Sequence, residues 1–134
     1  MKEFKNVEDY IRTSDIYRKL QTLNINSPKV IARDSDKHII IQEYIAGRDA
    51  SEMIIQGEMG GVYLNQVREV AKAVESNGIC LDYFPSNFIV TNKGIFYIGN
   101  VIYEKNDSNT FDTTGVKYWM NASELIKQKV RKKL

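Results

Sequence analysis

An acid and an amide lie five residues apart in the segment DYFPSNFIV, which covers residues 82–90. Pro85 stands between Asp82 and Asn87 and favours a turn, while the apolar residues after Asn87 are typical of a β-strand. A short, rigid loop of this kind brings both polar side chains to one point. The segment therefore predicts a site that uses the Asp82 carboxylate and the Asn87 amide.

The elements on either side of this loop can hold it in place. Upstream, apolar residues recur at helical spacing over residues 63–76, and the Asn77-Gly78 pair that follows is a typical helix C-cap. Downstream, two short apolar runs flank the turn-forming residues 91–94, which predicts a β-hairpin over residues 88–98. The loop should thus lie between a core helix and a hairpin.

The same loop resembles the catalytic loop H-R-D-L-x-x-x-N of protein kinases and kinase-like phosphotransferases. Asp82, Pro85 and Asn87 match that loop, whereas Cys80 stands where the family has His and Leu81 stands where it has Arg. In the family the Asp accepts the proton of the substrate hydroxyl and the Asn holds a magnesium ion. The resemblance therefore implies that Asp82 is catalytic and that Asn87 is a metal ligand.

A second segment resembles the same family. Residues 38–45 form a β-branched run that predicts a strand buried on both faces, and the sequence continues as IIIQEYIAG, similar to the strand and hinge of kinase-like proteins. The resemblance places Gln42 at the gatekeeper position and the backbone of Glu43, Tyr44 and Ile45 against the adenine of ATP. Taken alone, the run fits a plain central strand followed by a glycine turn better, and the loop match downstream is what favours the hinge.

The chain departs from the family at two places. The second strand of the hairpin should end at an acidic magnesium ligand, but Gly99 or Asn100 stands there, depending on the length of the hairpin. The amide oxygen of Asn100 attracts a hard cation less than a carboxylate does. No Gly-rich turn and no strand Lys are evident ahead of the first predicted helix, in which Asp15 could stand for the paired acid. We therefore expect weak catalysis or none.

The first part of the chain predicts a helix followed by strands. Apolar residues at helical spacing predict a helix over residues 7–23, which Ser14 could interrupt, so that Thr13 or Ser14 would cap a second helix. A strand should begin after Pro28, and residues 34–37 are typical of a hairpin turn.

Two capping boxes predict further helices, with Asp49 and Glu52 opening a short one and Asn121 and Glu124 opening the last. Trp119, just before the last helix, is expected to be a packing anchor. The last helix should turn its apolar residues inward, namely Leu125, Ile126, Val130 and Leu134. Its basic residues are typical of a solvated helix end that complements the helix dipole.

Composition narrows the functional classes. The chain has 134 residues, which suits one domain, and 19 basic against 17 acidic residues give a net charge of +2 and no general attraction for nucleic acid. Its single cysteine, Cys80, predicts a buried structural thiol, and its single histidine, His38, excludes a multi-histidine metal site. No secretory leader or long apolar run is evident, so we expect a cytoplasmic protein without a membrane span.

Together these observations predict an α+β, protein-kinase-like fold in one domain over residues 1–134. Residues 1–45 would form a reduced N-lobe sheet with the hinge strand, and residues 46–134 a mostly helical C-lobe that carries the catalytic-loop hairpin. The resemblance is closest to small bacterial Ser/Thr-kinase-like and aminoglycoside-kinase-like proteins with a shortened N-lobe. It implies ATP and magnesium as cofactors, with Asn87 and Asn100 as metal ligands.

Two functions remain open at this point. The chain could be a phosphotransferase that acts weakly, or not at all on its own, on a protein substrate. Alternatively, it could be a pseudokinase-type module that binds a protein partner without catalysis. Neither function involves nucleic acid.

Overall fold

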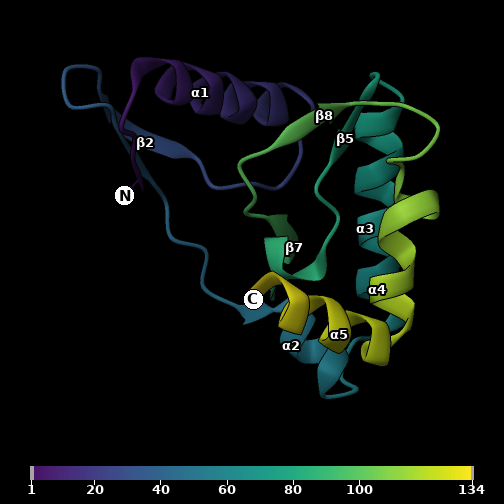
Figure 1. The fold of residues 1–134 in the computed structure, drawn as a ribbon. Coiled ribbons are helices and arrows are strands. Elements are labelled where there is room, and N and C mark those ends of the chain that lie inside the picture. The colour runs from purple at the N-terminus through teal and green to yellow at the C-terminus, as the bar shows by residue number, and fades with distance from the viewer. Residues whose placement is uncertain (1, 134) are drawn as a thin grey trace.

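The computed structural model describes residues 2–133 and shows a mixed α+β fold (Figure 1). The helices are α1 (Val7–Thr22), α2 (Ala50–Ile55), α3 (Gly61–Glu75), α4 (Val116–Met120) and α5 (Ala122–Lys133), with a 3-10 turn at Pro85–Asn87 and a π-helical turn at Phe111–Gly115. The strands are β1 (Lys2–Glu3), β2 (Val30–Asp34), β3 (Ile39–Gln42), β4 (Arg48–Asp49), β5 (Ile79–Leu81), β6 (Phe88–Thr91), β7 (Gly94–Tyr97) and β8 (Ile102–Glu104). Within residues 2–133 these strands form three small antiparallel sheets, so the predicted α+β class is confirmed.

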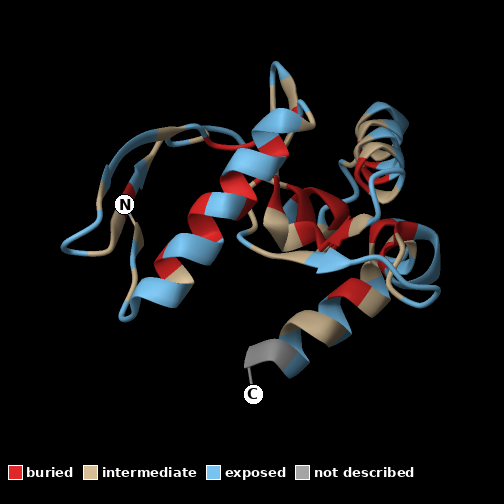
Figure 2. Cartoon of the chain, turned by 90° about the horizontal axis from the view of Figure 1, so that it is seen from above, coloured by how far each residue is buried: buried red, intermediate tan, exposed pale blue. Residues whose placement is uncertain are grey.

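The N-terminal sheet has the order β1-β3-β2 and packs against α1. Asn6 caps α1, because its side-chain oxygen accepts a hydrogen bond of 2.8 Å from the Asp9 N–H. The helix then runs without a break to Thr22, so the predicted interruption at Ser14 is wrong. Ser14 lies on the buried face of α1, where the helix continues through it instead of restarting. In Figure 2 buried and exposed segments alternate along this helix.

β3 is shorter and more exposed than its sequence predicts. Strand pairing covers Ile39–Gln42 only, and residues 43–47 form no regular structure on their way to α2. Ile40 is fully buried, whereas Ile41 on the opposite face is 41% exposed. The prediction of a strand over residues 38–45 that is buried on both faces is therefore wrong. A β-branched run shows that a strand is favoured, but not how many of its faces are covered.

The rest of the chain forms a second cluster of elements that contains most of the core. α3 turns Val67, Ala71 and Val74 inward, as its apolar spacing predicts. The β6–β7 hairpin pairs Phe88 with Tyr97, and Gly94 in its turn has a φ of +117°, which only glycine adopts readily. β4 pairs with β6, and β5 pairs with β8. The predicted order of helix, loop and hairpin is confirmed.

α5 closes the fold beside α2 and α4. The N–H of Glu124 donates a hydrogen bond of 3.2 Å to Asn121 Oδ1, which confirms half of the predicted capping box. Leu125 is fully buried, but Ile126 and Val130 are 44% and 54% exposed, so the predicted inward stripe is wrong beyond Leu125. Only a narrow face of α5 contacts its neighbours, and Lys129 on that side forms an ion pair of 3.0 Å with Glu52. Leu134 lies outside the described residues.

Across residues 2–133, none of the helices has both the length and the apolar character that crossing a membrane would require.

We predict that Leu20→Ala lowers the free energy of unfolding by about 2–5 kcal/mol, because removing a fully buried side chain leaves a cavity between α1 and its sheet. Ile11→Ala is the matched control on the same helix, at a position that is 51% exposed, and should cost about 1 kcal/mol or less. Urea unfolding followed by circular dichroism measures both. Equal losses in the two variants would contradict the buried face assigned to α1.

Candidate functional site

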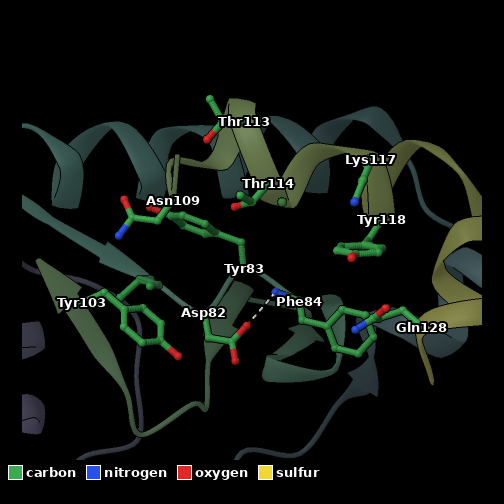
Figure 3. A pocket seen from close by; sticks show the side chains of 12 residues that line it. Asp82, Tyr83, Phe84, Tyr103, Asn109, Thr113, Thr114, Lys117, Tyr118 and Gln128 are labelled. Carbon is green, nitrogen blue, oxygen red and sulfur yellow. Dashed lines mark hydrogen bonds between the residues drawn. The ribbon is translucent and has the colours of Figure 1, made fainter. Parts of the chain in front are cut away.

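Hydrogen bonds fix the loop that follows β5 at both of its ends. The N–H of Asp82 donates to the Tyr97 hydroxyl at 3.3 Å, and the Asn87 side-chain amide donates to the Asp82 carbonyl at 3.2 Å. The N–H of Phe84 donates to Asp82 Oδ1 at 3.2 Å, as Figure 3 shows. These bonds orient the carboxylate and leave its other oxygen, Oδ2, without a hydrogen-bond partner among the described residues. The hydrogen bonds fix the loop as predicted, but Asn87 contacts Asp82 at its backbone carbonyl and not at its carboxylate, so the convergence of the two side chains stays a prediction.

Trp119 anchors the same loop from α4. Its indole N–H donates to the Tyr83 carbonyl at 2.8 Å, and its ring packs edge-on against Phe88 with 5.3 Å between centroids. The side chain is 4% exposed, which confirms the predicted packing anchor. A buried indole that also satisfies a loop carbonyl both fills the core and fixes the loop.

Tyr97 connects the loop to the segment beyond the hairpin. Its hydroxyl accepts from the Asp82 N–H and donates to the Val101 carbonyl at 2.8 Å. The side chain is 1% exposed, and this burial raises the pKa of Tyr97 above its ordinary value. Tyr97 therefore stays protonated at neutral pH and can keep both hydrogen bonds. A side chain at Gly99 would clash with the Tyr97 ring, so the site has no space for a larger residue at that position.

Asp82 lines a cavity of about 320 Å³ between the loop, β8, α4 and α5 (Figure 3). Tyr103, Thr113, Thr114 and Lys117 also line it. The hydroxyls of Thr113 and Thr114 each donate to the Thr110 carbonyl at 3.1 Å. The Lys117 ammonium lies 5.0 Å from the centroid of the Tyr118 ring, and that ring in turn packs edge-on against Phe84. The cavity thus combines a carboxylate, an ammonium group, hydroxyls and aromatic walls, a set suited to a polar side chain or a small polar ligand.

The two predicted metal ligands lie elsewhere. Neither Asn87 nor Asn100 lines the cavity of Asp82, and Asn100 is exposed. The N–H of Ile98 donates to the Asn87 carbonyl at 2.8 Å, so Asn87 joins the loop to the end of the hairpin. Residues 2–133 contain no cluster of three His, Cys, Asp or Glu side chains that could hold a metal ion. The predicted ligands Asn87 and Asn100 would offer a magnesium ion neutral amide oxygens only.

The predicted adenine-binding residues lie at the end of the N-terminal sheet. The N–H of Glu43 donates to the Lys29 carbonyl at 2.9 Å, and the Glu43 carboxylate accepts from the Lys29 N–H at 3.0 Å. Tyr44 is 90% exposed, and the buried Gln42 Oε1 has no hydrogen-bond partner among the described residues. Residues 42–45 do not line the cavity of Asp82. Because the Glu43 N–H is already used, an adenine ring at this segment would have to bind the backbone of Tyr44 or Ile45.

The structure contains a strand lysine that the sequence interpretation missed. Lys2 lies in β1, which pairs with β3, and its ammonium group contacts the Tyr17 hydroxyl on α1. Burial lowers the pKa of Lys2 and raises the pKa of Tyr17 to about 12, while a hydrogen bond from Gln42 opposes the shift of Tyr17. The statement that no strand Lys precedes the first helix is therefore wrong, although the partner on the helix is a tyrosine and not an acid. A strand of two residues is too short to show the alternating pattern of a β-strand. The only sequence signal for this strand lysine was therefore the presence of a Lys ahead of the first helix.

Two further assignments can be compared with the structure. Asp15, the suggested helix acid, is exposed and forms an ion pair of 3.3 Å with Arg18, so it is not the ion-pair partner of Lys2. Cys80 is fully buried with its thiol 3.2 Å from Asn109 Oδ1, and burial raises its pKa, which agrees with a structural thiol.

No model of a known protein family matches the chain, and no curated protein matches it. The kinase-like interpretation therefore depends on the residues and geometry described above.

We predict that Tyr97→Phe lowers the free energy of unfolding by about 1–3 kcal/mol, because two half-buried hydrogen bonds, to the Asp82 N–H and the Val101 carbonyl, are lost at about 0.5–1.5 kcal/mol each. Hydrogen exchange at the Asp82 amide should also accelerate. Tyr103→Phe is the control, since this tyrosine is 46% exposed and its loss should have little effect on either quantity. The role of Tyr97 would be refuted if both variants matched the parent in stability and exchange.

Proposed function

We propose that the chain is a protein-kinase-like domain related to ATP-dependent Ser/Thr phosphotransferases, and that its phosphoryl transfer is weak or absent when it acts alone. The observation that carries this proposal is the fixed loop between β5 and β6, which holds the Asp82 carboxylate at the wall of a polar cavity. The order of helix, loop and hairpin and the match to the family's catalytic loop add support.

On the substrate side, Asp82 is the general base of the proposed reaction. Its Oδ1 is held by the Phe84 N–H, so Oδ2 is the oxygen that would accept the proton of a substrate hydroxyl. A Ser or Thr side chain of a protein substrate, entering the cavity of about 320 Å³, would meet this oxygen beside the Tyr118 ring. The cavity is thus assigned to the acceptor and not to the nucleotide.

On the nucleotide side, the proposal places the phosphates of ATP near Lys2 and the adenine against residues 43–45. Tyr17 is uncharged at neutral pH because its pKa is raised to about 12, so the charge of Lys2 is not neutralised by its helix partner. A free ammonium can attract phosphate, but the hydrogen bond to a neutral tyrosine orients it less strongly than an ion pair would. Asn87 and Asn100 would contact magnesium through amide oxygens only, and this lack of charge is the reason for expecting slow transfer.

A second candidate function is a pseudokinase-type module that binds a protein partner without catalysis. It is supported by the contrast between the two sides of the site. Hydrogen bonds fix the Asp82 loop at the wall of its cavity, whereas the two residues proposed for the metal, Asn87 and Asn100, carry amides and not carboxylates. A retained cavity beside an incomplete metal site is what a binding module requires.

We predict that Asn100→Asp tightens the binding of magnesium-ATP, because one added carboxylate contact to the metal contributes about 1–3 kcal/mol, or roughly 5- to 150-fold in affinity. Calorimetric titration with magnesium-ATP measures the effect. The control is Asn92→Asp, which adds the same charge at an exposed position of the β6–β7 turn. Gly99→Asp is unsuitable as a control because its side chain would clash with Tyr97.

Two results would count against parts of this proposal. If neither the parent nor Asn100→Asp binds magnesium-ATP, the nucleotide role is lost and the partner-binding module is the better account. If the unmodified chain transfers phosphate within the usual kinase range of about 1–100 per second, the expectation of weak catalysis is wrong. In that case Asp82→Asn should abolish the transfer while leaving ATP affinity unchanged.

A further inference from the structure

Two arginines meet in a groove between α1 and β2, on the N-terminal sheet and away from Asp82. Arg18 comes from α1 and Arg33 from β2, and both side chains line the same two adjoining cavities, of about 240 Å³ and 340 Å³. We call these two cavities the arginine groove. Neither Asp82 nor Lys2 lines it, but Tyr17, which the Lys2 ammonium contacts, lines its larger cavity. The arginine groove is therefore distinct from the Asp82 cavity and adjoins the position proposed for the ATP phosphates.

The sheet register explains why Arg33 lies there. Arg33 is directly opposite Ile40 in the β2–β3 pairing, and directly opposed residues place their side chains on the same face of a sheet. Ile40 is fully buried on the face that α1 covers. Arg33 is therefore directed to the α1 side, where Arg18 lies one helical turn beyond Ser14.

The charges in the groove are not balanced. Arg18 has one exposed partner, Asp15, at 3.3 Å, whereas Arg33 has no ion pair within the described part of the chain. Lys29 adds a third basic side chain to the larger cavity. Like charges that share a groove repel each other, and an anion bound between them would relieve this repulsion.

The smaller cavity also offers hydroxyl donors. Ser14 and Ser35 both line it, and Ser14 is only 6% exposed. The buried Ser14 hydroxyl has no hydrogen-bond partner among residues 2–133. A buried polar group without a partner is costly, but the Ser14 oxygen has almost no exposed area, so a ligand in the cavity would reach it only after a local shift of the neighbouring side chains.

We propose that the arginine groove binds a phosphate group of a small soluble molecule. Two guanidinium groups can each donate paired N–H groups to the oxygens of one phosphate, and the Ser35 hydroxyl can bind an oxygen that remains. Asp15 faces the same cavity and weakens the attraction, so an affinity in the millimolar range is expected for inorganic phosphate alone. Pyrophosphate, with more charge and a longer span, binds more tightly because it can reach the adjoining cavity beside Lys29.

The test is a titration of inorganic phosphate and of pyrophosphate into the full chain, at constant ionic strength with chloride as the balancing anion, followed by NMR of the backbone amides. Saturable shifts are expected at Ser14, Arg18 and Arg33, with pyrophosphate binding tighter than phosphate. Arg33→Gln should weaken both by about tenfold or more, the loss expected for one charge-assisted contact. Arg33 is exposed, so this variant should fold normally, and its unshifted amide spectrum verifies that.

Two control variants locate the binding. Arg12→Gln removes an arginine from the same helix that pairs with Asp9 outside the groove, and it should leave both affinities within twofold of the parent. Lys2→Met removes the lysine whose ammonium contacts Tyr17 at the edge of the larger cavity, and it should weaken binding less than Arg33→Gln does. The proposal is overturned if the parent shows no saturable shifts, if Arg12→Gln weakens binding as much as Arg33→Gln, or if Lys2→Met abolishes binding while Arg33→Gln does not.

Discussion

The Tyr97 hydroxyl is the interaction on which the candidate site depends. It joins the Asp82 N–H at the start of the loop to the Val101 carbonyl beyond the hairpin, in a position that is almost fully buried. Without it, two half-buried backbone groups would lose their shared partner, and the Asp82 carboxylate would lose the fixed backbone from which it reaches the cavity. The close packing of this ring also explains why a glycine follows at position 99. One aromatic side chain thus fixes the start of the loop and leaves space only for a small residue at position 99.

The two sides of the candidate site differ in how completely their groups are held in place and paired with charge. On the Asp82 side, hydrogen bonds from Tyr97, Phe84 and Asn87 and an indole anchor fix the loop. On the side that we propose for the nucleotide, Lys2 contacts a tyrosine and not an acid, and Asn87 and Asn100 offer amides and not carboxylates. Phosphoryl transfer depends mainly on positioning and on charge neutralisation. The chain fixes the position of the Asp82 carboxylate, but it offers few charged groups to neutralise the phosphates. For this reason we propose slow transfer or binding alone.

The sequence predicted the elements that have a clear period or a capping signal. Residues 63–76 were recognisable from their apolar spacing, and the Asn121 cap and the hairpin turn at Gly94 follow from local chemistry. Features that depend on tertiary contacts could not be predicted. The exposure of Ile41 depends on what covers the sheet, and β1, with only two residues, exists because it pairs with β3. Tyr97 was visible only as another apolar strand residue, because nothing local indicates that its hydroxyl reaches Asp82 and Val101.

The measurement that tests the kinase-like account most directly is an NMR map of magnesium-ATP on the assigned amide spectrum of the unmodified chain. The account predicts saturable shifts at Tyr44, Ile45 and the side-chain amide of Asn87, with weaker changes around Lys2. These positions come from three separate parts of the chain, and only a nucleotide bound between the N-terminal sheet and the β6–β7 hairpin would contact all of them. Shifts confined to Arg18 and Arg33, or no saturable shifts at all, would contradict the account.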